Sequence, residues 1–324
     1  SMLRIYADAD NKPADYSESN VPYTPKRHLK ISMDGVDQGD FSMVMGYPGS
    51  TDRFLSSWGI EQALALYNPS VVDVRDLKLR TMKEHMDEDL GVRIQYAAKY
   101  AQTANYWKYY IGQSKGLKAL NVQGQKEAIE ARFSAWATSS PELEAEYGEA
   151  LNLIEAYYVA TDATAKADVY ALEAGLIGSD ITLFAVRFGR TAPGLFSGDA
   201  DQIAATKARL SGLCDDFFKD YDMATDRDLF INLMTKYQTD ISPENLPSFF
   251  ENVDNKYKGS IDRYATKMYE KSFLVNEESA RNFIANPSEK ALNKDLAVNA
   301  AMSILETYFG SMESEAQAKY DRGY

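Results

Sequence analysis

The chain has little of the chemistry that disulfides, metals and redox cofactors require. It contains one cysteine and two histidines in 324 residues. Cys214 has no partner for an internal disulfide and no CxxC or histidine neighbour, so we expect a small buried hydrophobic residue. Glycine-rich phosphate loops of the Walker and dinucleotide types are absent, which excludes the commonest nucleotide-cofactor classes. The sequence predicts neither a cofactor nor a metal.

Clusters of Lys and Arg are also missing. The 35 basic residues are outnumbered by 48 acidic ones, and the net charge of -13 argues against a nucleic-acid partner, because phosphate binding requires clustered cations. No run approaches the ~20 apolar residues of a membrane span, and the first residues lack the pattern of a signal peptide. A hydrophobic content of 45% with 26% charged residues is typical of a globular chain.

The patterning changes once along the chain. Within residues 1–50, turn signals such as Asp34-Gly35 and Pro48-Gly49 separate short apolar runs. Three runs are strand candidates and predict two or three strands: 3–6, 28–31 and 41–45. From residue 51 onward helical spacing dominates. We therefore expect a short β segment at 1–50 and a mainly α, multi-helix domain at 51–324.

Several helix boundaries can be predicted from capping residues and prolines. Asn68-Pro69 is expected to end a first helix, and residues 70–114, which lack proline, predict one long helix. Further helix starts are expected at Ser140-Pro141, Asp199 or Asp201, Ser242-Pro243, Asn276 and Asn286-Pro287. The helix from Ser140 is expected to run towards Leu172, and residues 194–198 are expected to form a loop.

One motif suggests a hydrolase. Residues 112–116 match the G-x-S-x-G pattern of a nucleophile elbow around Ser114. An elbow needs a strand before the serine, whereas residues 105–111 are helical in pattern, and both histidines precede Ser114. A helix end at Gly112 or Gly116 explains these glycines better.

The two histidines are poor candidates for a general base. His28 lies among Lys26, Arg27 and Lys30, which fits the start of a surface strand. His85 is surrounded by acidic residues on a predicted helix but has no second histidine at metal-binding spacing. A solvated acidic face is therefore the better interpretation of the His85 region.

An aromatic helix at residues 96–110 contains Asn105 on the same face as Ala97, Ala98 and Ala101. The small residues allow another backbone to approach closely. An asparagine on such a face needs hydrogen-bond partners. Taken from the residues alone, Asn105 is more readily a satisfied buried amide than a ligand contact, and both interpretations stay open.

Three strings carry a family resemblance. Residues 39–53 (Gly-Asp-Phe-Ser-Met-Val-Met-Gly-Tyr-Pro-Gly-Ser-Thr-Asp-Arg), Tyr67-Asn68-Pro69 and 103–108 (Thr-Ala-Asn-Tyr-Trp-Lys) closely resemble, in the same order, the bacterial family-46 serine dipeptidyl-peptidases of the dipeptidyl-peptidase 7 and 11 type. In that family a chymotrypsin-like double β-barrel holds the catalytic triad, and a large helical domain is inserted into the barrel and caps the active site. The resemblance implies a helical cap domain with a short β remnant of the barrel at residues 1–50.

The resemblance also implies that no catalytic residue lies in this chain. The resemblance implies that the family's histidine lies well upstream, its aspartate just ahead of this chain, and its serine beyond Tyr324. Asp40 belongs to a second Gly-Asp-Phe-Ser string and is not the catalytic aspartate. We expect the chain by itself to be inactive, since a serine without its base and oxyanion donors is a weak nucleophile.

One site residue is implied by the resemblance, namely Asn105, which corresponds to the asparagine of the helical domain that binds the substrate's free N-terminus. An ammonium group offers three donors and needs acceptors such as a side-chain carbonyl. The implied function is that of a serine-type dipeptidyl-peptidase releasing N-terminal dipeptides from oligopeptides. The implied partners are the oligopeptide and the flanking barrel halves of a longer parent protein, which could be a homodimer, in the periplasm or secreted. The alternative is a non-catalytic helical peptide-binding or scaffolding protein.

Overall fold

The computed structural model describes residues 4–43, 45–46, 51–310 and 320–323. The chain divides into two units, Ser1–Asp52 and Arg53–Tyr324. This division lies close to the predicted change of character after residue 50. That the first unit is a remnant of a peptidase barrel stays a prediction.

The first unit contains one small antiparallel ladder. Strand β1 (Tyr6–Ala7) pairs with β2 (Val21–Pro22), with Tyr6 opposite Pro22. The intervening loop is held by Asn11, whose side-chain amide donates to the carbonyl of Thr24 at 2.8 Å and accepts from its N–H at 2.8 Å. Asn11 has a positive φ of 61°, a conformation that asparagine tolerates better than most residues.

The other strand predictions in this unit are wrong for the residues that the structure describes. Residues 28–31 form no strand, and Leu29 and Ile31 are 94% and 88% exposed. Residues 41–43 and 45 form none either, while Val44 lies outside the described residues. A strand persists only where a neighbouring strand accepts and donates its backbone hydrogen bonds, and no described segment pairs with these runs.

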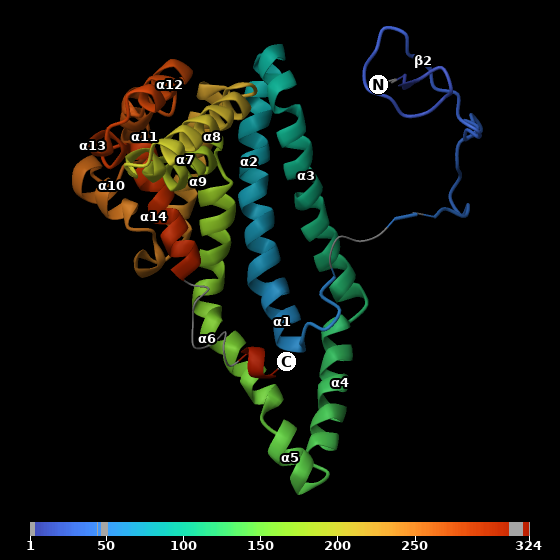
Figure 1. The fold of residues 1–324 in the computed structure, drawn as a ribbon. Coiled ribbons are helices and arrows are strands. Elements are labelled where there is room, and N and C mark those ends of the chain that lie inside the picture. Colours follow the sequence, from blue (N-terminus) through green and yellow to red (C-terminus); the bar gives the residue numbers. More distant parts are fainter. Residues whose placement is uncertain (1–3, 44, 47–50, 311–319, 324) are drawn as a thin grey trace. The chain divides into compact units, whose positions relative to one another are not determined.

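The described part of the second unit consists of helices and the turns between them (Figure 1). In chain order they are α1 Ser57–Gln62, the π-helix Ala63–Tyr67, α2 Asn68–Glu88, α3 Leu90–Ala119, α4 Val122–Ala137, α5 Pro141–Tyr147, α6 Ala150–Tyr170, the π-helix Ala171–Leu176, α7 Asp180–Thr191, the 3-10 helix Ala192–Phe196, α8 Ala200–Phe218, α9 Met223–Asp240, the 3-10 helix Pro243–Asn245, α10 Phe249–Tyr257, α11 Ile261–Lys271, α12 Glu277–Ala285, α13 Glu289–Leu292 and α14 Leu296–Gly310.

Asn68-Pro69 does not end the first helix, contrary to the prediction. The chain passes from α1 through one π-helical segment directly into α2, which has the proline in its first turn. The N–H of Asn68 bonds to the carbonyl of Ala63, five residues back. Proline lacks an N–H, and the wider π turn before it removes the clash that the ring would make in a continuous α-helix.

The predicted single helix at 70–114 is instead an antiparallel hairpin of α2 and α3, which lie side by side (Figure 1). The break is at Asp89, which has an extended backbone (φ -131°, ψ 126°). Its carboxylate accepts from the N–H of Gly91 at 2.5 Å and of Val92 at 3.1 Å. An aspartate N-cap starts a new helix because it satisfies amides that have no helical partner.

The helix predicted from Ser140 starts where expected, since the Ser140 hydroxyl accepts from Leu143 N–H. It does not run unbroken to Leu172 but divides into α5, α6 and a π-helix, with the first break at Gly148. A Cβ on Gly148 would lie 2.5 Å from the carbonyl oxygen of Glu144, so glycine is required at this tight turn.

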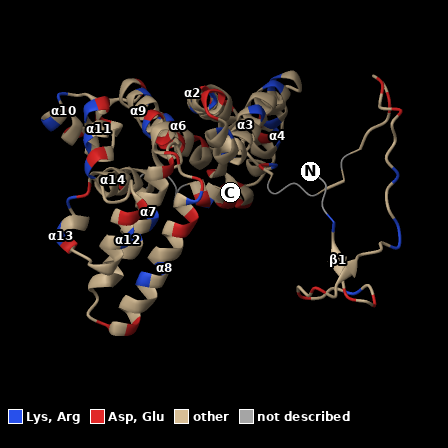
Figure 2. Ribbon diagram, turned by 90° about the horizontal axis from the view of Figure 1, so that it is seen from above, with Lys and Arg blue, Asp and Glu red and all other residues tan. Residues whose placement is uncertain are grey.

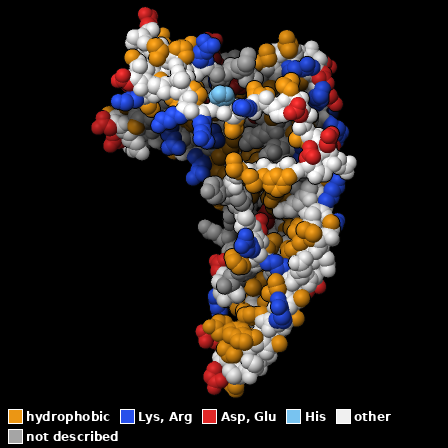
Figure 3. Space-filling model, turned by 90° about the vertical axis from the view of Figure 1, so that its right-hand side faces the viewer, with side chains coloured by type: hydrophobic (Ala, Val, Ile, Leu, Met, Phe, Trp, Pro, Cys, Tyr) orange, Lys and Arg blue, Asp and Glu red, His pale blue; other side chains and the backbone are white. Residues whose placement is uncertain are grey.

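The α4–α5 end of the unit is aromatic. The rings of Trp136 on α4 and Tyr147 on α5 lie 5.2 Å apart, and this contact joins the two helices across their turn. Within α4, the rings of Phe133 and Trp136 lie 5.7 Å apart. Figure 3 shows hydrophobic side chains gathered at this lower end of the molecule. Trp136 remains 47% exposed.

The other predicted caps are confirmed in part. Asp199 accepts from the first amides of α8, and Asn276 accepts from the N–H of Ser279 at the start of α12. The predicted loop at 194–198 falls partly in a 3-10 helix, and Ser242-Pro243 opens a 3-10 turn rather than an α-helix. Ser288, two residues beyond Asn286, is the cap of α13.

The hydrophobic core lies where α7, α8, α9, α11, α12 and α14 pack together with α2 and α6. Aromatic rings fill much of it; Phe184 and Phe217, for example, stack at 4.0 Å. Cys214 is fully buried here, as predicted, and burial raises the pKa of its thiol to about 11. An un-ionised buried thiol is inert.

The mainly α, multi-helix fold class is therefore confirmed. Acidic and basic residues are interspersed along helices such as α8 and α11 (Figure 2). Within the described residues no single helix is both long and apolar enough to cross a membrane. One bent pair, Pro141–Leu176 with Asp180–Phe196, meets the length and composition test together.

Candidate functional site

Helix α3 carries the predicted site residue and has two different faces. One face is buried: Tyr96 is 0% and Thr103 5% exposed. The opposite face, with Ala97, Ala98 and Ala101, is exposed over the described residues. The aromatic helix predicted at 96–110 is confirmed as part of α3.

Asn105 lies on the exposed face. Its side chain makes no hydrogen bond to any described residue, so the interpretation as a satisfied buried amide is wrong. An exposed amide retains a free carbonyl acceptor and two free donors. Whether Asn105 binds a substrate ammonium stays a prediction.

The nucleophile-elbow interpretation of Ser114 is excluded by its surroundings. Gly112, Ser114 and Gly116 all lie inside α3, with no strand before the serine. The predicted helix end at Gly112 or Gly116 is wrong as well, because the helix continues to Ala119. The Ser114 hydroxyl accepts from the side-chain amide of Asn68 at 3.0 Å, which ties α3 to the start of α2.

The two histidines belong to different units. His28 belongs to the first unit and is exposed. His85 of α2 contacts α9, with its Nε2 atom 2.9 Å from Oδ2 of Asp228, so it is an interhelical partner rather than part of a purely solvated face. Over the described residues there is no group of three His, Cys, Asp or Glu side chains placed to hold a metal ion.

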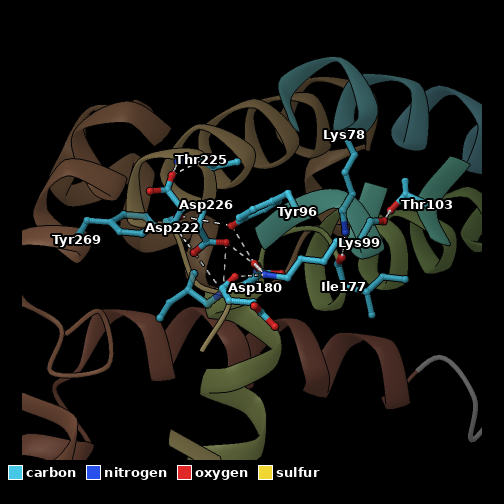
Figure 4. Close-up of polar contacts among 12 residues, drawn as sticks. Lys78, Tyr96, Lys99, Thr103, Ile177, Asp180, Asp222, Thr225, Asp226 and Tyr269 are labelled. Atoms are coloured by element: carbon cyan, nitrogen blue, oxygen red, sulfur yellow. Dashed lines mark hydrogen bonds and ion pairs between the residues drawn. The ribbon is translucent and has the colours of Figure 1, made fainter. Parts of the chain in front are cut away.

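A polar network joins the buried face of α3 to the start of α7 (Figure 4). Asp180 Oδ2 accepts from Tyr96 Oη at 2.9 Å and from Lys99 Nζ at 2.6 Å. Lys99 also donates to the carbonyl of Asp220 at 2.7 Å. Because Tyr96 and Lys99 both lie on α3, these bonds fix the rotation of α3 relative to α7.

A second carboxylate lies behind the first. Asp226 of α9 is 0% exposed and accepts from the N–H groups of Asp180 and Ile181 and from Tyr269 Oη at 2.8 Å. It thereby caps the N-terminus of α7 from another helix, a favourable place for an anion. Burial, and next the charge of Asp180, raise the pKa of Asp226 to about 7, against the hydrogen bonds from Tyr269 and the two amides.

A cavity of about 460 Å³ opens beside this network, between α2, α3, the second π-helix and α7. Arg75 forms a buried ion pair with Glu173, with Nη2 to Oε1 at 2.8 Å, and lies over the ring of Tyr106 at 5.1 Å. Lys78 donates to the carbonyl of Ile177 at 2.5 Å. None of these contacts was predicted from the sequence.

A family model described as peptidase S46 matches residues 1–323. The chain belongs to the peptidase S46 family. The resemblance drawn from the three sequence strings is confirmed.

Members of this family align with most of the chain. It is 36% identical over 308 residues to dipeptidyl-peptidase 7 of Porphyromonas endodontalis, covering 94% of this chain and 37% of that protein. It is 32% identical over 321 residues to an Asp/Glu-specific dipeptidyl-peptidase of Flavobacterium psychrophilum, covering 99% of this chain and 44% of that protein. The chain thus spans less than half the length of these relatives.

Solved structures of the family agree with the fold. The crystal structure of Porphyromonas endodontalis DPP11 in complex with the dipeptide Arg-Glu matches with a TM-score of 0.75 and 27% identity, covering 99% of this chain and 45% of that one. The complex of the same protein with Arg-Asp matches with a TM-score of 0.72 and 29% identity. The helical arrangement is therefore that of this peptidase family.

Proposed function

We propose that this chain is the helical cap region of a serine-type dipeptidyl-peptidase and that Asn105 binds the free N-terminus of the oligopeptide substrate. Family membership and the names of the relatives support the activity. The observation that carries the role of Asn105 is its exposure on α3 with no intramolecular hydrogen bond among the described residues. A carbonyl acceptor in that state needs no rearrangement before it meets an ammonium group.

The cap would bind the amine and exclude longer or folded substrates, while barrel segments outside this chain supply the histidine, aspartate and serine of the triad. An exopeptidase counts residues from the chain end, so it must fix the terminal ammonium at a set distance from the nucleophile. Closure of a cap over the cleft also removes water and strengthens the polar contacts to the substrate. The chain alone would then bind peptide weakly and hydrolyse none.

The remaining parts of the proposal concern the parent protein. Its partners would be oligopeptides with a free N-terminus and the two flanking barrel halves, in a homodimer, with no nucleic-acid partner or membrane span. We place it in the periplasm or outside the cell, where peptide nutrients are available. The relatives include both dipeptidyl-peptidase 7 and Asp/Glu-specific proteins, so the preference at the penultimate residue is not part of the proposal.

Kinetics of the complete parent enzyme test the role of Asn105. Asn105→Ala should lower kcat/KM for free-amine peptides by roughly 1.5 to 3 kcal/mol, the range for a hydrogen bond to a charged group. Asn105→Asp should retain most of the activity, because a carboxylate also accepts from an ammonium group. Unchanged kinetics in Asn105→Ala would remove the assignment, and Asn105→Asp provides the control for correct folding of α3.

Turnover of a dipeptidyl reporter separates this proposal from the alternative of a non-catalytic peptide-binding or scaffolding protein. The parent protein should release dipeptides, and the 324-residue chain should release none. A parent protein that binds peptides without cleaving them, with equal affinity for free and acetylated N-termini, would favour the scaffolding alternative.

A further inference from the structure

Among the residues that the structure describes, three cations and two carboxylates line the cavity beneath α3. Arg75, Lys78 and Lys99 line it, together with Glu173 and Asp180. The buried Tyr96 and Thr103 of α3 are among its lining residues, and Asn105 is not. Its volume of about 460 Å³ is within the range of small-molecule sites.

Both carboxylates already hold a cation. Glu173 pairs with Arg75 at 2.8 Å, and the two side chains are only 6% and 11% exposed. Asp180 pairs with Lys99 at 2.6 Å and also accepts from Tyr96. A charge-assisted bond of this length occupies the carboxylate oxygen that makes it.

Lys78 is the cation that is left over. Among the described residues no carboxylate lies within ion-pair distance of its ammonium group, which donates only to the carbonyl of Ile177. An ammonium group has three donors, so two remain for another acceptor. Figure 4 shows the Lys78 side chain reaching from α2 towards Ile177 and Lys99.

The electrostatic surroundings of Lys78 favour an additional anion beside its ammonium group. Burial lowers the pKa of Lys78, although the nearby charges of Asp180 and Glu173 act in the opposite direction. Asp180 and Glu173 are each bonded to another cation, so their charges offset the cost of burying the Lys78 ammonium group only in part. An anion beside this ammonium group would complete the offset. The side chains lining the cavity carry a net charge of +1, so a bound monoanion brings the total to zero. This favours a monoanion over a doubly charged phosphate so close to Glu173 and Asp180.

Apart from Gln102 and Thr103, the uncharged part of the cavity wall is apolar or aromatic and includes Met82, Leu172, Leu183 and Tyr110. We propose that this cavity binds a small organic carboxylate with an apolar or aromatic body, whose carboxylate accepts from Lys78. The body lies against Leu172, Leu183 and Tyr106. The carboxylate has two sources with the same chemistry, a free organic acid or the C-terminus of a short peptide.

A purely structural role for Lys78 is the competing explanation. Ile177 ends the second π-helix, and a lysine that donates to a terminal helix carbonyl stabilises that end. This role requires no ligand, so a binding measurement on the unaltered chain separates the structural role of Lys78 from the ligand-binding role.

Isothermal titration of the 324-residue chain with phenylacetate and with phenylacetamide, its uncharged analogue, provides the test. We expect saturable binding of phenylacetate, a rise in melting temperature with its concentration, and at least tenfold weaker binding of phenylacetamide. Gly-Gly-Phe and its C-terminal amide form a second pair. Tighter binding of Gly-Gly-Phe than of phenylacetate identifies the peptide C-terminus as the source, and the reverse order identifies a free acid.

Variants locate the site. Lys78→Met should weaken phenylacetate binding roughly 10- to 100-fold. Lys83→Met on the same helix, whose side chain is 52% exposed and pairs with Asp87, is the matched control and should leave binding unchanged. Equal binding of phenylacetate and phenylacetamide, absence of binding to the unaltered chain, or full binding by Lys78→Met would overturn the proposal. These measurements need no peptidase activity, so their failure leaves the Asn105 proposal intact.

Discussion

The buried carboxylate of Asp226 should make the stability of the chain fall as the pH rises from about 4 to about 7. The pKa of Asp226 is raised from 3.8 to about 7 in the folded chain, whereas the unfolded chain titrates near the ordinary value. Between these two values the folded state binds more protons than the unfolded state, so the free energy of unfolding decreases with pH. The contribution is complete below about pH 4 and lost above about pH 7.

The magnitude follows from the size of the shift. Each pKa unit corresponds to about 1.4 kcal/mol, and the shift from 3.8 to about 7 gives an upper limit of about 4 kcal/mol. This value is an upper limit because part of the raised pKa comes from the charge of Asp180, so that part belongs to the interaction of two carboxylates and not to Asp226 alone. We expect a measured change of roughly half that limit or more, which is a large part of a typical net stability.

Urea unfolding followed by circular dichroism at several pH values tests this, with Asp226→Asn as the comparison. The asparagine stays neutral, so the difference in free energy of unfolding between variant and unaltered chain should grow in favour of the variant from pH 4 to pH 7. Other carboxylates cancel in this difference, since they are present in both proteins. Parallel pH profiles of the two proteins would refute the reasoning, whatever their absolute stabilities.

Two further predictions concern ends and pairs of helices. Asp89→Ala should destabilise the chain by roughly 1 kcal/mol because two α3 amides lose their acceptor, and Glu88→Ala in the same turn should change the urea midpoint much less. Glu173→Ala should cost roughly 3 to 5 kcal/mol because it leaves Arg75 buried without its carboxylate, while the double replacement of Glu173 and Arg75 by Met should cost less than this single change. A double variant that is no more stable than Glu173→Ala would contradict the second prediction.

Capping residues were predicted well because a cap depends on residues close together in sequence. Ser140, Asp199 and Asn276 each bond to an amide two or three positions later, and the sequence contains both partners. Predictions from neighbouring residues alone were wrong at Asn68-Pro69, where a helix end was expected, and at Asp89, where no break was expected. A proline in a first helical turn and an aspartate within a proline-free run are each compatible with a helix start or a helix interior, and packing of α2 against α3 decides between them.

The cavity and its polar network could not be predicted, because each of their bonds joins residues far apart in sequence. Lys99 and Asp180 are separated by 81 positions, and Arg75 and Glu173 by 98. In the sequence each of these side chains resembles an ordinary charged residue on a helix. That Lys78 has no carboxylate partner among the described residues emerges only when each nearby carboxylate has been assigned to another cation.

The two proposals use different faces of one helix, and this arrangement suggests a mechanical role for α3. Tyr96 and Lys99 hold α3 to Asp180, while Asn105, less than two turns beyond Lys99, lies on the exposed face. A helix transmits a rotation along its length because its backbone hydrogen bonds make it rigid. We therefore expect that weakening the contacts to Asp180 changes the direction in which Asn105 presents its carbonyl, to the extent that the packing of α3 against α2 allows α3 to rotate.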